Sequence, residues 1–176
     1  MRDRALPHYE FLTGFGTPLA PVRAALTRRE RMLDPTATQP DDRGSRTHAL
    51  AAARAALEKQ AEEVALLDLR AVSTIADFFL VCTADNPRHL EALQHHLAAV
   101  LSHRGCRVEH TEGTTVPPAA RGVYVPERGW ILMDCGDLVV HLFDRHARDF
   151  YRIEDLWADA PRVPVEPLPA SRSSAG

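Results

Sequence analysis

The sequence lacks any apolar run of the roughly 18 residues that a membrane-spanning helix requires. Its three cysteines, Cys82, Cys106 and Cys135, are an odd number without CxxC spacing, which indicates neither a disulfide framework nor a zinc knuckle. The N-terminal residues contain no continuous apolar segment like that of a signal peptide, and six acidic residues among the first 46 argue against a transit peptide. These absences predict a cytoplasmic protein that does not bind membranes.

Glycine-rich phosphate loops are also missing. No segment matches GxGxxG or GxxxxGK[ST], the two patterns in which backbone N–H groups cradle the phosphates of a nucleotide. The net charge of −3 argues against an extended surface that neutralises nucleic-acid phosphates, so we expect no direct sequence-specific nucleic-acid binding. Lys59 is the only lysine beside many arginines, a bias that we attribute to genomic base composition.

The composition that is present, 45% hydrophobic and 26% charged residues, is that of a globular domain. Residues 1–46 are rich in proline and charge without a sustained apolar period, which predicts a disordered or mis-annotated extension, with Met32 as an alternative start. The Pro/Ser-rich residues 164–176 are predicted to form a disordered tail. The folded domain is therefore expected to span residues 47–163.

Periodicity within this domain alternates between helix and strand. Helical spacing predicts three helices, at 47–63, 86–105 and 145–157. Short apolar or alternating runs predict five strands, at 64–70, 77–84, 106–113, 130–134 and 137–143. Thr47 and Asn86 are predicted N-caps, and Pro87 suits the first helical position. The order αββαβββα predicts an α/β sandwich whose mixed, mainly five-stranded sheet is flanked by helices.

Two aspartates are the first candidates for catalysis, because the two-residue spacing at Cys135–Gly136 predicts a tight hairpin between them. Asp134 and Asp137 would then face each other with side chains roughly 5 Å apart, and such a pair could share a divalent metal. A nucleotidyl transferase also needs a Gly-Ser phosphate cradle and a DxD pair on one strand face, and the sequence has neither. We therefore expect no catalytic residue, no metal and no cofactor.

The other nucleophiles and bases are weaker candidates. His141 is predicted to share a strand face with Asp137, Val139 and Phe143, where a lone histidine is more often structural than a base. Cys135 has no histidine placed as its obvious base. Three further histidines recur every seven residues along one helix, and a rise of about 10 Å per step is too long for two of them to hold one metal.

The remaining polar and aromatic residues are of the types enriched in binding surfaces. They are Trp130, Tyr151, Trp157, Arg88, Arg148 and Arg152. Trp157 is expected in the core because it shares a predicted helix face with Ala147, Phe150 and Ile153. Trp130 begins its strand beside a polar segment and is expected to be less buried. This composition points to a surface that binds a partner.

Several ordered motifs occur within residues 64–163. They are Ser-x-Ile-x-Asp at 73–77, the pairs at 88–89 and 112–113, Trp-x-x-x-Asp-x-Gly-Asp-x-x-x-His at 130–141, Arg-x-Phe-Tyr at 148–151 and Leu-Trp at 156–157. With these motifs, this part of the chain resembles the Iojap family, the bacterial and organellar ribosomal silencing factors. The resemblance implies a nucleotidyltransferase-like fold without the transferase motifs, and a regulatory protein rather than an enzyme.

The resemblance also implies a partner. Members of the family bind the large ribosomal subunit through its intersubunit-face protein, number fourteen, and sterically prevent the small subunit from joining when nutrients run short. They are often homodimers when free. By position in the motifs, the implied contact residues are Trp130, Cys135 and Tyr151. The implied polar rim or structural support consists of Asp134, Asp137, Arg88 and His89.

Two departures from the family pattern affect this expectation. Cys135 replaces a larger apolar or aromatic residue, which removes contact area, and the segment 114–129 is longer than the usual connection. Two alternatives also stay open. One is a factor for large-subunit assembly that uses the same surface, and the other is a divergent nucleotidyl transferase that uses Asp134 and Asp137 with Mg²⁺.

Overall fold

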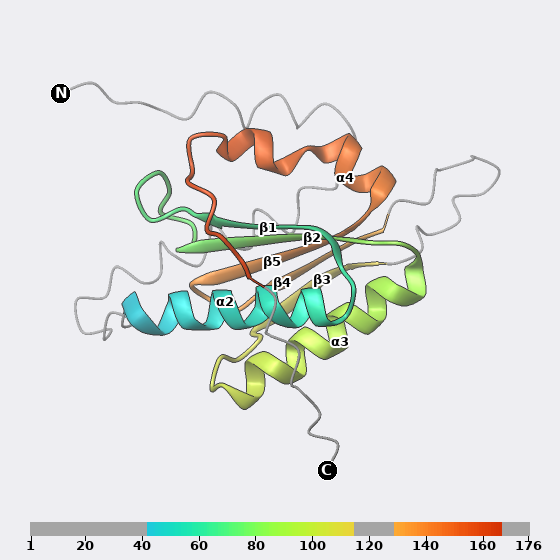
Figure 1. Ribbon diagram of the computed structural model, residues 1–176, viewed down its shortest axis with the longest axis horizontal. Helices are drawn as coiled ribbons and strands as arrows, with labels where there is room; N and C mark the ends of the chain where they lie inside the picture. Colours follow the sequence, from blue (N-terminus) through green and yellow to red (C-terminus); the bar gives the residue numbers. More distant parts are fainter. Residues whose placement is uncertain (1–41, 115–128, 167–176) are drawn as a thin grey trace, which may run out of the picture.

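The computed structural model describes residues 42–114 and 129–166 and shows one mixed sheet between two layers of helix (Figure 1). The strands are β1 (Glu62–Asp68), β2 (Phe78–Ala84), β3 (His110–Thr114), β4 (Trp130–Asp134) and β5 (Leu138–Asp144). The helices are α2 (Asp42–Glu58), α3 (Pro87–His103), α4 (Arg145–Tyr151) and the 3₁₀-helix η3 (Ile153–Trp157). The predicted fold class and the predicted element order are both confirmed.

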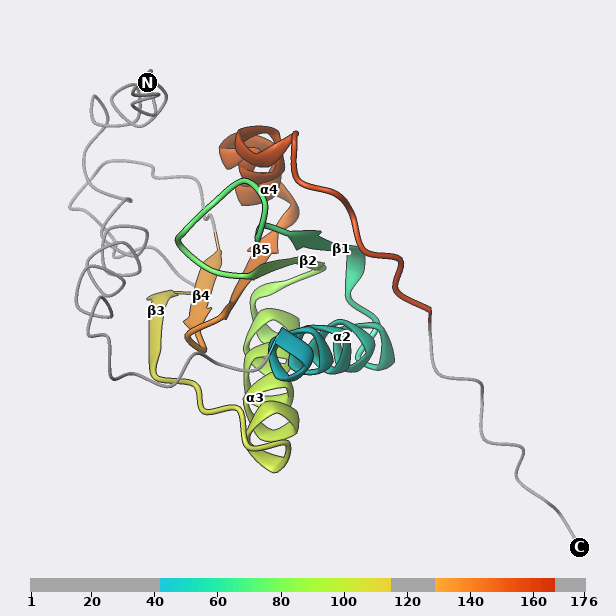
Figure 2. The same cartoon turned by 90° about the vertical axis from the view of Figure 1, so that its left-hand side faces the viewer.

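The five strands lie in the order β1-β2-β5-β4-β3. The central pair β2 and β5 is parallel, and the other three pairs are antiparallel. Every residue of β2 is buried, because helices cover both faces of the sheet there. Figure 2 shows α2 and α3 on one face, α4 on the other, and β3 at the edge opposite β1.

The face under α2 and α3 holds the larger core. Four leucines of α3 recur at helical spacing and are fully buried: Leu90, Leu93, Leu97 and Leu101. They meet the alanine-rich side of α2 and the inward residues of the strands. The predicted cap of α3 is confirmed, since the Asn86 side chain accepts a hydrogen bond from His89 N at 2.9 Å and Pro87 opens the helix.

Helix α2 begins at Asp42, five residues before the predicted start at Thr47, so the predicted N-cap and the predicted disorder of 42–46 are wrong. Ser45 is only 4% exposed and Ala49 is fully buried, so packing against the core extends the helix into a segment of weak helical propensity. Residues 1–41, 115–128 and 167–176, which include most of the predicted extension, insert and tail, lie outside the described residues.

The turn between β4 and β5 lies one residue later than predicted. Asp134 pairs with Val139, and Cys135 N donates to the Leu138 carbonyl at 2.9 Å, so the turn residues are Gly136 and Asp137. Gly136 occupies the first turn position with φ +85°. Glycine adopts this conformation without steric cost because it has no Cβ. Asp134 and Asp137 therefore do not face each other across the hairpin.

The last predicted helix is broken. Arg152 adopts a left-handed conformation, φ 43° and ψ 47°, between α4 and η3. Ala147, Ile153 and Trp157 are buried, which confirms the expectation that Trp157 belongs to the core. Phe150 is 57% exposed, so its predicted place on the core face is wrong. The break at Arg152 turns Ile153 and Trp157 back to the sheet while Phe150 stays outside.

Candidate protein-binding site

Aromatic side chains gather where the start of β4 meets the end of α4. The Trp130 ring stacks on Phe143 with centroids 5.1 Å apart and lies 4.8 Å from the Tyr151 ring. Phe150 meets Tyr151 edge to face at 5.0 Å. Trp130 and Tyr151 are half-buried, and Phe150 is exposed. We call Trp130, Phe150 and Tyr151 the aromatic patch.

Buried rings support the aromatic patch from below. Phe143 is fully buried, and His141 lies beside it with a centroid separation of 6.1 Å. His141 also contacts Phe79 edge to face at 4.8 Å. As predicted, it lies on one strand face with Val139 and Phe143, inside the core. Burial lowers the pKa of His141 to about 3, so its imidazole is neutral at physiological pH.

Asp144 connects α4 to the start of β4, the two elements that carry the aromatic patch. Its Oδ1 accepts a hydrogen bond from Ala147 N at 2.6 Å and so caps α4, while its Oδ2 accepts from Gly129 N. The Asp144 N–H in turn donates to the Gly129 carbonyl at 2.8 Å. One side chain thus fixes the residue before Trp130 relative to the helix that ends in Tyr151. Asp144 was not among the residues predicted from the sequence, although an aspartate just before a helix is a known capping signal.

Gly113 permits the close approach of β3 to the backbone of Trp130. It adopts φ +106°, and a Cβ built there would lie 1.9 Å from the Trp130 carbonyl oxygen. Any side chain at this position would push β3 away from the start of β4. The close approach of the two strands therefore explains why a glycine stands at position 113 of the motif at 112–113.

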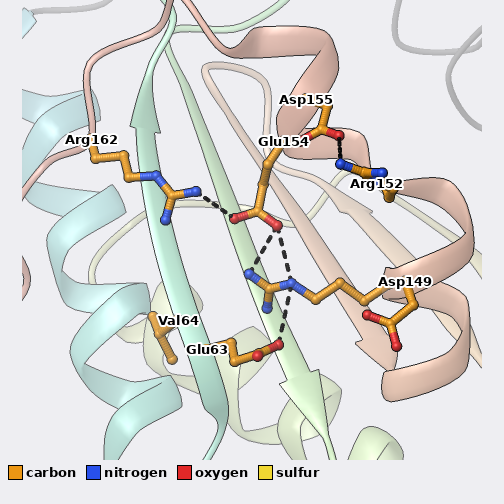
Figure 3. A pocket seen from close by; sticks show the side chains of 8 residues that line it. Glu63, Val64, Asp149, Arg152, Glu154, Asp155 and Arg162 are labelled. Carbon is orange, nitrogen blue, oxygen red and sulfur yellow. Dashed lines mark hydrogen bonds and ion pairs between the residues drawn. The ribbon is translucent and has the colours of Figure 1, made fainter.

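An ion-pair network holds α4 against the sheet (Figure 3). Arg148 is 8% exposed, and its guanidinium donates to the Thr83 hydroxyl at 2.8 Å and to Glu154 at 3.0 and 3.1 Å. Arg162 reaches the other oxygen of Glu154 at 3.1 Å, which ties in the segment after η3. Arg148 was a candidate for binding a partner, but the structure places it in this buried network.

The same network lines an open cavity of about 600 Å³ between α4, η3 and β1. Glu63 lies 3.7 Å from the Arg148 guanidinium, and Arg152 pairs with Asp155 at 2.6 Å. Glu154 pairs with both Arg148 and Arg162, and Figure 3 shows Glu63 on the strand side of Glu154. Most charges around the cavity are used in holding the fold together.

Arg88 and His89 lie at the same end of the sheet as the aromatic patch. A Cβ added to Gly129 would lie 2.8 Å from a methyl group of Leu90, so the first turn of α3 lies next to the start of β4. Arg88 is exposed. The His89 ring makes a hydrogen bond with the Lys59 carbonyl at 2.8 Å and accepts one from Asp85 N at 3.2 Å. His89 thus connects the end of α2 to the start of α3.

Cys135, Asp134 and Asp137 lie at the other end of β4, about 13 Å from Trp130 along the strand. Cys135 packs on the core beneath α2 and α3, and its hydrogen bond with Cys106 raises the pKa of the Cys135 thiol. The Asp134 carboxylate accepts from Gly136 N at 2.8 Å within the turn. The structure therefore does not bring Cys135 into one patch with Trp130 and Tyr151, and its contact with a partner stays a prediction.

Residues 42–114 and 129–166 contain no group of three or more His, Cys, Asp or Glu side chains placed to hold a metal ion. Burial raises the pKa of Cys82 to about 12, so that thiol stays protonated. No described helix is both long enough and apolar enough to cross a membrane.

The fold and this site define a class: a small α/β domain with partly exposed aromatic side chains, held in place by a capping aspartate and a buried arginine. The family described as ribosomal silencing factor during starvation matches residues 42–176. The chain belongs to this family, so the resemblance to the ribosomal silencing factors is confirmed.

Individual relatives agree with this assignment. The ribosomal silencing factor RsfS of Halalkalibacterium halodurans is 38% identical over 109 residues, which are 62% of this chain and 84% of the relative. That of Bacillus subtilis is 34% identical over 115 residues, 65% of this chain and 88% of the relative. A crystal structure of a Bacillus halodurans protein, 32% identical, has a TM-score of 0.50 and covers 65% of this chain and 94% of its own. A mouse protein named mitochondrial assembly of ribosomal large subunit protein 1 is 24% identical over 100 residues, 57% of this chain and 40% of its own.

Proposed function

We propose that this protein represses translation by binding the large ribosomal subunit and blocking the small subunit from joining. The expected contact on the ribosome is the intersubunit-face protein number fourteen, and nutrient limitation is the expected condition. The aromatic patch carries the proposal. Trp130, Phe150 and Tyr151 present partly or largely exposed rings on a braced support, in a chain that belongs to the ribosomal silencing factors.

The proposed mechanism is occupancy without a chemical step. A few aromatic anchors carry most of the binding energy in many protein–protein interfaces, and a surface held rigid before binding loses less conformational entropy on association. Asp144 and Arg148 supply that rigidity by fixing α4 to β4 and to β2. A small protein bound on the intersubunit face would then exclude the other subunit by its volume.

Sucrose-gradient sedimentation tests the proposal. Purified, salt-washed subunits are mixed with the wild-type chain or with Phe150→Ala, and fractions are probed for the protein and for joined ribosomes. We expect the wild-type chain to migrate with the large subunit and to reduce the joined peak, and the variant to do neither at the same concentration. A wild-type chain that stays at the top of the gradient while subunits join normally contradicts the proposal.

The name of the mouse relative favours a second candidate, a factor for large-subunit assembly that uses the same surface. The two functions differ in the subunit they need, because silencing acts on mature subunits and assembly on immature ones. Loss of the gene would then lead to accumulation of large-subunit precursors during growth in rich medium if assembly is the function. Silencing alone predicts a normal precursor profile in rich medium.

The structure gives the nucleotidyl transferase alternative little support. Asp134 faces Val139 across the hairpin and uses its carboxylate to hold the turn, so it does not form a pair with Asp137. A thermal shift on adding Mg²⁺ with ATP or CTP is therefore not expected. The homodimer implied by the resemblance and the cytoplasmic location predicted from the sequence stay predictions. Sedimentation equilibrium of the free chain and fractionation of cells check them.

A further inference from the structure

Three polar ring atoms beneath the aromatic patch have no hydrogen-bond partner among the residues that the structure describes. They are both ring nitrogens of His141 and the indole Nε1 of Trp130, and all three are buried. The two rings are neighbours, with centroids 5.9 Å apart and ring planes 36° apart. His141 is 1% exposed, so bulk solvent does not reach its nitrogens.

Packing alone does not explain a histidine at this position. A buried donor or acceptor without a partner costs free energy, and native structures rarely keep one without a reason. Phenylalanine could make the ring contacts that His141 makes with Phe79 and Phe143 and would bury no polar atom. The imidazole nitrogens therefore need a hydrogen-bonding partner, and so does the N–H of the neighbouring indole.

We propose that Trp130 and His141 together bind one buried water molecule, and that this water fixes the orientation of the Trp130 indole within the aromatic patch. The indole N–H is a donor only, and a neutral imidazole offers one donor and one acceptor. The water would accept from Trp130 Nε1 and donate to the unprotonated nitrogen of His141. A buried water needs two to four polar partners, and Trp130 Nε1 and one ring nitrogen of His141 supply two.

His141 is thus a positioning residue for the proposed binding surface. Ring contacts with Phe143 and Tyr151 limit where the indole lies, but a hydrogen bond also fixes which edge of the indole points inward. The effect on partner binding rests on the proposed function, whereas the water site itself does not.

Nuclear magnetic resonance of the chain labelled with ¹⁵N-tryptophan tests the water site directly. Its two indole N–H signals belong to Trp130 and Trp157, and Trp157→Phe assigns them. We expect the Trp130 indole proton to show a cross-peak at the water frequency, with the sign of a long-lived bound water rather than of chemical exchange. A Trp130 indole proton without such a cross-peak overturns the proposal.

His141→Phe tests the role of that water in binding, because it keeps an aromatic ring and removes both nitrogens. We expect the water cross-peak to disappear, the Trp130 indole signal to shift, and the affinity for purified large subunits to fall about 3-fold or more, the effect of one lost hydrogen bond. Unchanged affinity in a folded His141→Phe variant overturns the positioning role.

Two further variants separate this role from general stability. Val139→Ala removes buried volume on the same face of β5, so it should lower the unfolding midpoint but keep the cross-peak and the affinity. His141→Gln keeps hydrogen-bonding atoms and should retain the cross-peak, which covers the case in which His141→Phe does not fold. If the wild-type chain shows the cross-peak but binds no subunit, the proposed function fails while the water site stands.

Discussion

The indole of Trp130 lies against the ring of Tyr151, with centroids 4.8 Å and ring planes 45° apart. Trp130 begins β4 and Tyr151 ends α4, so this contact joins a strand of the sheet to the helix that covers it. Both rings stay partly accessible beside the exposed ring of Phe150. The inner sides of the two rings therefore pack against the core, and their outer sides are accessible to a partner.

Phe150→Ala should weaken binding to the large subunit by about 2 kcal/mol, roughly 30-fold in affinity, if Phe150 is an anchor of the interface. Its ring is 57% exposed, so the free energy of unfolding should change by less than about 0.5 kcal/mol. Co-sedimentation over a concentration series and urea unfolding measure the two quantities. Leu156→Ala is the matched control, since this exposed side chain on η3 is outside the aromatic patch, and equal losses in the two variants would contradict the assignment.

Asp144→Ala should destabilise the domain by about 2–4 kcal/mol, because it removes the cap of α4 and leaves the Gly129 N–H without its acceptor. Binding should weaken as well, since Trp130 and Tyr151 lose their common support. Urea unfolding checks the first effect and co-sedimentation the second. Asp149→Ala on the same helix makes a good control, and a cost as large as that of Asp144→Ala would refute the specific role of the cap.

Gly113→Ala should destabilise the domain by more than about 1 kcal/mol, because the new Cβ would collide with the Trp130 carbonyl and the backbone has a positive φ. Gly44→Ala is the matched control in α2, where nothing lies within 4 Å of a Cβ. That substitution should stabilise the helix by about 0.5–1 kcal/mol. Thermal unfolding of the two variants should therefore shift in opposite directions, and shifts of the same sign would disprove the close approach.

Arg148→Met should cost about 3–5 kcal/mol of stability, because it leaves Glu154 and Thr83 in partly or fully buried positions without the guanidinium that they bind. Arg152→Gln breaks only an exposed pair with Asp155 and should cost no more than about 1 kcal/mol. Chemical denaturation distinguishes the two arginines. Similar costs for both would mean that the network around Arg148 does not stabilise α4.

Stability should depend on pH through His141. Its pKa is about 3 in the folded protein because of burial, against an ordinary value of 6.5, so the unfolded chain binds a proton between these values that the folded chain does not. The contribution of His141 to stability should therefore fall by up to about 1.4 kcal/mol per pH unit as the pH decreases below 6.5, and be constant above it. Urea unfolding of the wild type and of His141→Phe from pH 4.5 to 8, in steps of about one pH unit, measures the difference in their free energies of unfolding. A constant difference across that range would show that His141 titrates normally.

Local signals allowed much of the fold to be predicted. Asn86 and Pro87 mark the start of α3 because capping and a fixed φ are properties of the residues themselves. The strands β2 and β5 could be predicted as apolar runs, because both faces of the sheet are covered there and nearly all of their residues are buried. The start of α2 was not predicted, because the helix there depends on the burial of Ser45 against distant parts of the chain.

The site was only partly predictable. Trp130 and Tyr151 were found through residue type and family motif, but their contact arises from the packing of α4 on the sheet. Phe150 was placed on the wrong side because nothing in the local sequence announces a left-handed arginine after Tyr151. Cys135 was grouped with the aromatic residues, and the hairpin register, which depends on where Gly136 falls, directs it to the opposite core.

The left-handed Arg152 also divides the surface into positions that can and cannot be altered freely. Trp130 and Tyr151 contact buried neighbours, so a change at either one alters folding and recognition together. Phe150 precedes the break and points away from the core, so its identity can change with little effect on folding. Under the proposed function, an engineer seeking a graded repressor would begin at Phe150, since substitution there would change recognition and leave folding almost unaltered.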